Sequence, residues 1–239
     1  MLLMGVRDDT RGLSPLFKMA LQLIGALLAV FFGVRLEGIG VWAVPATLLC
    51  LLLLTNAYNL VDGLDGLCAG CSGIGGGAFA LLGLASGDPT ITALGLSVLG
   101  GCLGFLPYNF RRPKLFLGDT GAQLIGFCLG LMTVRSINAG RTVTALCIVA
   151  YPLAEILATV LRRLRRGQSP LAADRGHFHH RLIDRGLSHG RATVLLLLPS
   201  LFLSMVGLLL PLATPASEAV LLLSIPGITL CWRMEGKRS

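Results

Sequence analysis

The stretch TLLCLLLLTNAYNLVDGLDG, residues 47–66, decides the fold of this chain. Its apolar run completes a segment that begins near residue 40, and two carboxylates, Asp62 and Asp65, follow that segment directly. A helix that spans a bilayer needs roughly 20 mostly apolar residues. The stretch therefore predicts a membrane helix that is followed at its C-terminal end by two acids. A function of the protein has to explain why acids stand at this position.

The composition of the whole chain agrees with a membrane protein. Of the 239 residues, 54% are hydrophobic and 13% are charged, and the mean hydropathy is +0.78. Soluble domains carry about 25% charged residues, which excludes a soluble domain. We expect an all-α polytopic transmembrane helical bundle that forms one domain over 1–239, with an N-terminal helix stub and about eight spans: 16–35, 40–57, 67–85, 89–108, 120–138, 142–161, 192–212 and 217–232. The glycine-rich span 67–85 is predicted to be a packed inner helix, and prolines allow kinks, for example in 142–161.

Charge indicates which side of the membrane each connection faces. Threading the spans puts 17 of the 20 Lys and Arg residues on the side of the connections at about 1–15, 58–66, 109–119, 162–191 and 233–239. By the positive-inside rule this side is cytoplasmic. The basic excess is thus explained by topology and indicates no nucleic acid. Most acids share this side, although acids contribute little to the rule, so their grouping needs another cause.

The first acidic motif is the adjacent pair Asp8 and Asp9. Adjacent carboxylates repel, and a cation such as Mg²⁺ between them supplies the compensating charge. The alternative is a solvated turn. The second motif spaces Asn56, Asn59, Asp62 and Asp65 three residues apart, which on a helix gives a polar stripe. Here the alternative is a polar helix cap, and the glycines at 63 and 66 are expected to end or loosen the helix.

Two later motifs add groups that suit phosphates. Asp119 lies where the next helix begins, and a helix N-terminus favours a phosphate or a carboxylate; the alternative is a simple N-cap. Asn109, Lys114 and Phe116 precede it with an amide, a cation and a ring. In the last cytoplasmic connection His177, His179 and His180 stand among four arginines, including Arg181. Arginines beside imidazoles favour an anion site over zinc, and a merely basic loop is the alternative.

The CxxC pair Cys68 and Cys71 is interpreted as helix packing, because no second pair or nearby histidine accompanies it. Carboxylates for a hard cation and basic groups for phosphates thus converge at one membrane face. This combination predicts phosphoryl transfer on a lipid. A cation-coupled transporter is the alternative, but it usually places polar sites near the midplane and carries internal repeats.

Four blocks, in order, carry a family resemblance: DDTRGLSPLFK (8–18), NAYNLVDGLDGL (56–67), PYNFRRPKLFLGDTGA (107–122) and DRGHFHHRLIDRGLS (174–188). They resemble the signature blocks of the polyprenyl-phosphate N-acetylhexosamine-1-phosphate transferases of glycosyltransferase family 4. The histidine block is similar to that of the bacterial branch that uses UDP-N-acetylglucosamine. Members usually carry about two further helices before the first block, so the chain is expected to be N-terminally truncated, and an inactive truncated member is a further alternative.

The resemblance implies a Mg²⁺-dependent enzyme, with Mn²⁺ as a substitute, in the bacterial inner membrane with its site facing the cytoplasm. Undecaprenyl phosphate would accept the sugar 1-phosphate of a UDP-sugar, with release of UMP, at the start of cell-envelope glycan synthesis; a homodimer is left open. The implied metal ligands are Asp119, Asp8 and Asp9, and the implied catalytic residues are Asp8, Asp9, Asp62 and Asp65. The implied substrate-binding residues are Lys18, Asn59, Asn109, Lys114, Phe116, His177, His179, His180 and Arg181.

Overall fold

A computed structural model describes residues 2–11, 13–110, 113–169 and 182–209 of the chain. Its regular elements are helices: α1 (Leu2–Arg11), α2 (Pro15–Phe31), the 3₁₀ helix η1 (Gly40–Trp42), α3 (Ala43–Val61), α4 (Leu67–Ser86), α5 (Pro89–Asn109), α6 (Gly118–Asn138), α7 (Thr142–Ile148), α8 (Ala150–Arg165) and α10 (His189–Leu209). The expected all-α architecture is thereby confirmed for these ranges.

Within the described ranges, five helical segments are long and apolar enough to cross a membrane: Gly40–Val61, α4, α5, α6 and α10. The pair α7 and α8 gives a sixth if it is counted as one broken span. The segment predicted at 16–35 is helical only from Pro15 to Phe31, which is 17 residues and shorter than these five. The span predicted at 217–232 lies outside the described residues.

The segment predicted as one span at 142–161 is bent. The axes of α7 and α8 differ by 73° at a break around Val149. Pro152 lies in the first turn of α8 and has no N–H to donate to the carbonyl of Ile148, so the helical hydrogen-bond series is interrupted there. The bend is the kind of kink that proline was expected to allow in this segment.

Helix α4 is the inner helix that its glycines predicted. Within its most apolar window 78% of the residues are buried, against 17% in α5. A Cβ atom added to Gly95 of α5 would lie 2.6 Å from the carbonyl oxygen of Gly76 in α4, so only glycine allows the two backbones to approach this closely. Cys68 and Cys71 are free and buried in α4, which confirms that they pack the helix.

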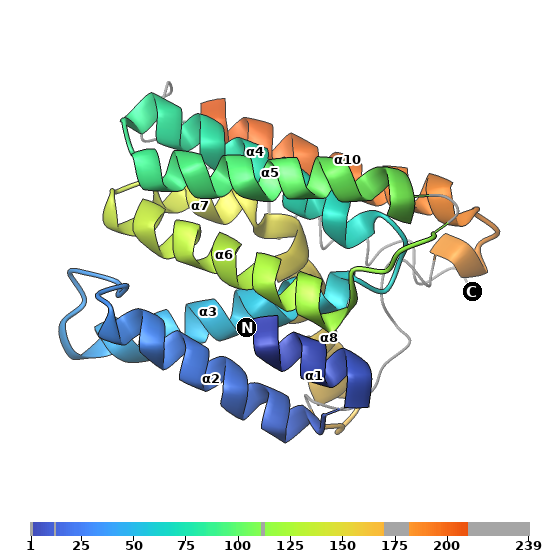
Figure 1. Ribbon diagram of the computed structural model, residues 1–239, viewed down its shortest axis with the longest axis horizontal. Helices are drawn as coiled ribbons and strands as arrows, with labels where there is room; N and C mark the ends of the chain where they lie inside the picture. Colours follow the sequence, from blue (N-terminus) through green and yellow to red (C-terminus); the bar gives the residue numbers. More distant parts are fainter. Residues whose placement is uncertain (1, 12, 111–112, 170–181, 210–239) are drawn as a thin grey trace.

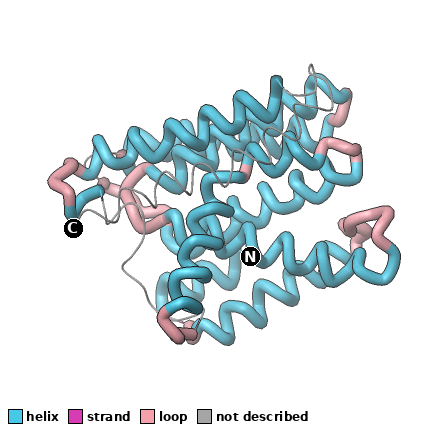
Figure 2. The backbone as a smooth tube through the Cα atoms, turned by 180° about the vertical axis from the view of Figure 1, so that it is seen from behind, coloured by secondary structure: helices cyan, strands magenta, loops and turns pink. Residues whose placement is uncertain are grey.

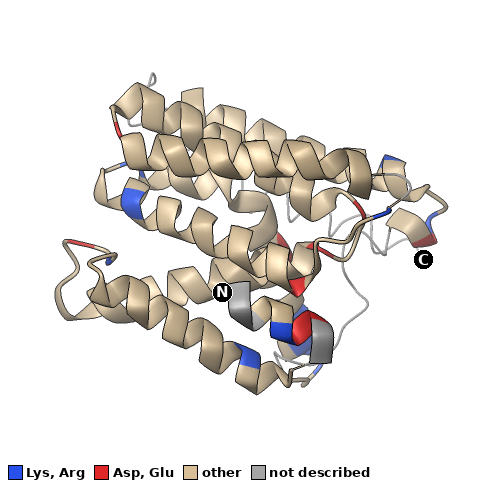
Figure 3. Cartoon of the chain, in the orientation of Figure 1, with Lys and Arg blue, Asp and Glu red and all other residues tan. Residues whose placement is uncertain are grey.

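The helices form layers that bring distant parts of the sequence together. Figure 1 shows α4, α5 and α10 side by side, with α6 and α7 next to them and α3 and α2 on the far side of α6. The short helix α1 packs against α6. Figure 2 shows the same bundle from behind, with the connecting loops at its two ends. Figure 3 shows that charged residues gather toward these ends and that the middle of the long helices is uncharged.

Candidate functional site

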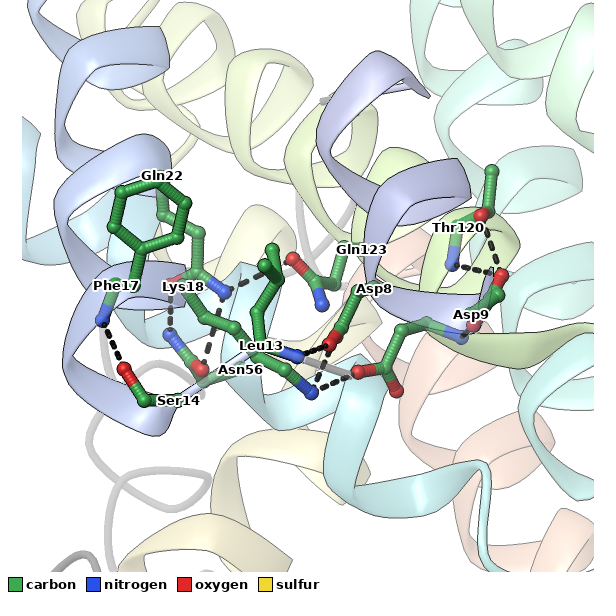
Figure 4. A network of polar contacts seen from close by, with 11 residues as sticks. Asp8, Asp9, Leu13, Ser14, Phe17, Lys18, Gln22, Asn56, Thr120 and Gln123 are labelled. Atoms are coloured by element: carbon green, nitrogen blue, oxygen red, sulfur yellow. Dashed lines mark hydrogen bonds and ion pairs between the residues drawn. The ribbon is translucent and has the colours of Figure 1, made fainter. Parts of the chain in front are cut away.

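A lysine joins two acids that are more than 100 residues apart in the sequence. The Nζ atom of Lys18 forms ion pairs with Oδ2 of Asp8 and with Oδ2 of Asp119 (Figure 4). Lys18 occupies the first turn of α2, which begins where Pro15 takes the first helical position and Ser14 Oγ accepts the amide of Phe17 at 3.4 Å. The ends of α1, α2 and α6 thus meet at one ammonium group.

Asp8 is held as a carboxylate. Its side chain is buried, and Oδ1 accepts the amide of Leu13 at 2.7 Å. Burial by itself would raise the pKa of Asp8, but hydrogen bonds that involve Asp119, Lys18 and the Leu13 amide outweigh it and hold this pKa below its usual value. Asp8 is therefore ionised at neutral pH, in a position where its charge is available to a cation.

Asp9, the neighbour of Asp8, holds the N-terminus of α6. Its Oδ1 accepts the amide of Asp119 at 3.0 Å, and its Oδ2 accepts the amide of Thr120 at 3.2 Å and the hydroxyl of Thr120. The N-cap residue of α6, Leu117, has no side-chain cap of its own. The sequence predicted that this helix end favours a phosphate or a carboxylate, and the structure places the carboxylate of Asp9 there.

A close backbone contact lets Asp9 reach this helix end. Gly5, one turn before Asp9 on α1, lies against Thr120: a Cβ atom added to Gly5 would be 2.2 Å from the Cα atom of Thr120. No side chain fits at that distance, so α1 can approach the start of α6 only with glycine at this position. The adjacent acids therefore divide their tasks, since Asp8 meets Lys18 and Asp9 caps α6.

Asp62 and Asp65 do not extend a helical stripe. Helix α3 ends at Val61 with Asp62 as its C-cap, and Asp65 lies in the turn before α4. The predicted four-residue stripe is therefore wrong beyond Asn59. The helix already ends at Val61, and the chain turns through residues 62–66 to Gly66, whose φ of +76° forms the N-cap of α4. The Thr193 hydroxyl of α10 donates to the carbonyl oxygen of Asp65 at 2.9 Å and so anchors this turn.

The turn places Asp62 among other acids. Burial, together with the negative charges of Asp119, Asp65 and Asp9, raises the pKa of Asp62 to about 7, although a hydrogen bond from the Gly118 backbone acts against these effects. The charges that act on Asp62 come from α6, from α1 and from its own turn. Four acids predicted from three separate motifs therefore share one electrostatic environment.

We expect Asp62 to change its charge near neutral pH. Because its pKa in the folded protein lies above the usual 3.8, the carboxyl is neutral below about 7 and charged above it. The charged form is disfavoured in the fold, so it lowers stability progressively as the pH rises from about 4 to about 7. Infrared titration without divalent cations should show a protonated carboxyl band that disappears near pH 7.

The band should be absent in Asp62→Asn and retained in Asp184→Asn, which changes an exposed acid. A band that survives in Asp62→Asn would assign the titration to another carboxyl and contradict the prediction.

The residues before α6 differ in their exposure. Asn109 is buried, and it accepts the amide of Gly66 through Oδ1 at 2.7 Å and donates to the carbonyl oxygen of Leu115 at 2.9 Å. It therefore ties the turn before α4 to the segment before α6. Lys114 and Phe116 are exposed, and Phe116 has 74% of its surface accessible. Of this set, Lys114 and Phe116 are open to a ligand, while the contacts of Asn109 give it a structural task.

Asn59 keeps an open acceptor near the acids. Its Oδ1 atom is buried and has no hydrogen-bond partner among the described residues. An unsatisfied acceptor of this kind is uncommon in folded proteins, and it lies one turn before Asp62 on α3. The predicted residues His177, His179, His180 and Arg181 lie outside the described residues.

A cavity of about 670 Å³ lies at the start of α10. Its lining contains no acidic residue and consists of Leu187, Ser188, His189, Gly190, Arg191, Val194, Leu195 and Leu198. The acids instead lie at the ends of α1, α3 and α6. The candidate site is therefore defined by convergent side chains and not by this cavity.

The donor chemistry suits a hard divalent cation. In the described part of the chain no three His, Cys, Asp or Glu side chains are grouped so as to hold a metal by themselves. Mg²⁺, however, is usually bound by one or two carboxylates together with waters and substrate phosphates. Asp8 and Asp119 already converge on one cation, the Lys18 ammonium. These two carboxylates fit Mg²⁺ best, because both oxygens of Asp9 serve α6.

Sequence reasoning missed the residues that hold the acids in place. These are Gly5, Gln22, Thr120 and Gln123. A signal existed for the two glutamines, since each is an amide inside a segment predicted to cross the membrane, where polar groups need partners. No pattern in the sequence indicates that Gly5 touches Thr120, because the two residues meet only in the folded bundle.

The fold and the site define a class: a helical membrane protein with an acidic centre at the ends of its helices. Comparison with known proteins gives the family. The sequence profile of glycosyl transferase family 4 matches residues 1–137, and the chain belongs to this family. The sequence resemblance to this family is thereby confirmed.

Curated relatives extend the match. The chain is 33% identical over 228 residues to the "Probable undecaprenyl-phosphate N-acetylglucosaminyl 1-phosphate transferase" of Bacillus subtilis, which covers 89% of this chain and 64% of the relative. It is 36% identical over 232 residues to the decaprenyl-phosphate N-acetylglucosaminephosphotransferase of Mycolicibacterium smegmatis, covering 81% of this chain and 57% of the relative. It is 30% identical over 226 residues to the undecaprenyl-phosphate alpha-N-acetylglucosaminyl 1-phosphate transferase of Escherichia coli K12, covering 86% of this chain and 61% of the relative. The chain thus spans less than two thirds of the length of these relatives.

Proposed function

We propose that this chain transfers N-acetylglucosamine 1-phosphate from UDP-N-acetylglucosamine to undecaprenyl phosphate and releases UMP. The names of the relatives from Bacillus subtilis and Escherichia coli support the polyprenyl phosphate acceptor and the sugar. The distribution of Lys and Arg supports a site that faces the cytoplasm from the bacterial inner membrane, because 17 of the 20 fall on the side of the acids.

The observation that carries the proposal is the meeting of Asp8 and Asp119 at the ammonium of Lys18, beside helices of membrane length. Phosphoryl transfer demands little covalent chemistry from a protein and depends on positioning and on neutralising charge. Two carboxylates that share a cation suit positioning and charge neutralisation, because the carboxylates attract a metal ion and the Lys18 ammonium can contact a phosphate. The donor dissolves in the cytoplasm and the acceptor in the bilayer, and the ends of membrane helices are where both can meet.

The reaction exchanges one phosphoanhydride bond for another. An oxygen of the lipid phosphate attacks the β-phosphorus of the UDP-sugar and forms a new P–O bond. The bond between the β-phosphorus and the bridging oxygen breaks, and UMP leaves with that oxygen and its electron pair. The product is a polyprenyl diphosphate that carries the sugar, and no oxidant or reductant is needed.

The residues of the chain divide this work. Asp119 and Asp8 would hold Mg²⁺, which when bound offsets the negative charge of the diphosphate. Lys18, whose ammonium lies beside these carboxylates, would hold a phosphate oxygen of the substrate. Asp62, with a pKa near 7, is suited to take a proton from the lipid phosphate as it approaches. Asp9 positions Asp119 through the end of α6 and need not touch substrate.

The test is a release assay on the purified chain in detergent or nanodiscs. With Mg²⁺, undecaprenyl phosphate and a panel of UDP-sugars, UMP should form fastest with UDP-N-acetylglucosamine. Removal of divalent cations with EDTA should stop release, and added Mg²⁺ should restore it, with Mn²⁺ as a substitute. A folded protein that releases no UMP from any sugar would contradict the proposed function. Release that EDTA leaves unchanged would contradict the metal requirement alone.

A further inference from the structure

Directly beneath the charged site lies a second polar layer made of three amide side chains. Gln22 of α2 donates through Nε2 to Oε1 of Gln123 on α6 at 3.1 Å and to Oδ1 of Asn56 on α3 at 3.4 Å. Asn56 returns a hydrogen bond from Nδ2 to Oε1 of Gln22 at 2.7 Å. Figure 4 shows these amides directed toward one another between the helices. Gln22 is the hub, because it contacts both of the others.

The two layers are in register. Gln22 follows Lys18 by four residues on α2, and Gln123 follows Asp119 by four residues on α6. Four residues along a helix correspond to about 6 Å, and side chains at this spacing share a face. On two helices the charged residue at the end is therefore followed, one turn deeper, by an amide that faces the same neighbour.

Burial makes the amide layer sensitive to geometry. Gln22 is 1% exposed and Gln123 is 0% exposed. A buried amide without a partner is costly, so the helices are favoured in the one rotation in which these groups meet. The Nε2 atom of Gln123 has no partner among the described residues, so among these residues Gln123 is joined to α2 by its hydrogen bond with Gln22. Loss of that bond removes the hydrogen bond that joins Gln123 of α6 to α2.

We propose that Gln22, with Asn56 and Gln123, is a positioning cluster that fixes α2 against α6 so that Lys18 meets Asp8 and Asp119. The kinetic consequence rests on the proposed transferase function, whereas the structural consequence does not. None of the three amides contacts a reacting group in this arrangement. They act by setting where the ammonium of Lys18 lies.

The variants that test this are Gln22→Met and Gln123→Met. Methionine has nearly the same shape as glutamine, so the packing should persist, while the partner amide that loses its hydrogen bond lowers the stability. A misplacement of about 1 Å costs up to about 100-fold in rate, and we expect kcat to fall about 10- to 100-fold while KM for the UDP-sugar changes by less than about twofold. The double variant should be little slower than Gln22→Met, because both changes break the same link.

A second readout does not depend on turnover. The chain offers Lys114 as an exposed reference for Lys18, whose ammonium is engaged by two carboxylates. Brief treatment with an amine-reactive reagent, followed by mass spectrometry, gives the labelling rate of each lysine. In both methionine variants the ratio of Lys18 to Lys114 labelling should rise at least severalfold. If Gln22→Met does not fold, Gln123→Met gives the same comparison with one bond removed.

Matched controls are Thr55→Val on α3 and Thr133→Val on α6. Both hydroxyls are fully buried, and each donates to a carbonyl of its own helix, Leu51 and Leu129 respectively. These changes remove a buried polar atom without removing a hydrogen bond between two helices, so the rate and the labelling ratio should stay at wild-type values. An unchanged labelling ratio in both methionine variants would overturn the positioning role. Wild-type protein that releases no UMP would overturn the transferase function alone, and the labelling ratio would still decide the role of the cluster.

Discussion

Asp119→Asn should lower the rate of UMP release by about 10²- to 10³-fold, the loss that follows when one preorganised electrostatic contact is removed from an active site. Asp119 is one of the two carboxylates that meet at Lys18. Asparagine keeps the size of the side chain and the start of α6, because the amides at this helix end are held by Asp9. The lost property is therefore charge, and the thermal stability should change little.

The matched control is Asp88→Asn, the same chemical change at the far end of the bundle. Asp88 caps α5 by accepting the amides of Thr90 at 3.0 Å and Ile91 at 3.1 Å, and asparagine caps helices equally well. Helix α4 has 20 residues, so about 30 Å separate Asp88 from the turn that carries Asp62. This control should release UMP at nearly the wild-type rate. Comparable rates for Asp119→Asn and wild type would remove Asp119 from the active site.

Gly5→Ala should reduce both the rate and the stability. The added methyl group would lie 2.2 Å from the Cα atom of Thr120, so α1 must move away from α6. Overpacking of this kind costs about 1–3 kcal/mol. The movement would also pull Asp9 from the amides of Asp119 and Thr120 and shift Asp8 away from Lys18. A shift of about 1 Å costs on the order of 100-fold in rate.

Gly101→Ala on α5 controls for the change itself. A Cβ atom added to Gly101 meets no atom within 4 Å, and alanine is the better helix former. UMP release and thermal unfolding of the purified variants should separate the two glycines, with Gly101→Ala close to wild type. If Gly5→Ala behaves like Gly101→Ala, the contact between α1 and α6 does not support the site.

The sequence predicted the helices better than it predicted their bends and ends. Apolar length located α4, α5, α6 and α10 because a membrane helix must satisfy its own backbone, which leaves a long local signal. The extension of an α3 stripe through Asp62 and Asp65 was wrong, since spacing alone does not show that α3 ends at Val61 and that a turn follows. The break between α7 and α8 was foreseeable as a proline kink, but its 73° angle depends on packing.

The same limit applies to the site. The motifs predicted that Asp8, Asp9, Asp62 and Asp119 converge, and the ion pairs and the raised pKa of Asp62 agree with this. The tasks of individual residues were not predictable. A sequence shows two equal acids at positions 8 and 9, whereas the fold gives one to Lys18 and the other to α6. Such a division depends on contacts across about 110 residues, which no local pattern records.

The contact between Asp9 and the start of α6 has a consequence for biosynthesis. Asp9 and Asp119 are 110 residues apart, so the ribosome must synthesise the five helical segments between α1 and α6 before α1 can pack against α6. Until then Asp9 lacks the backbone amides of Asp119 and Thr120, whereas Leu13 and Lys18, the nearby partners of Asp8, are already made. The acidic site is thus completed late in synthesis, when α1 at the beginning of the chain packs against α6 in its middle. A chain interrupted before residue 120 would lack the contact between Asp9 and the start of α6.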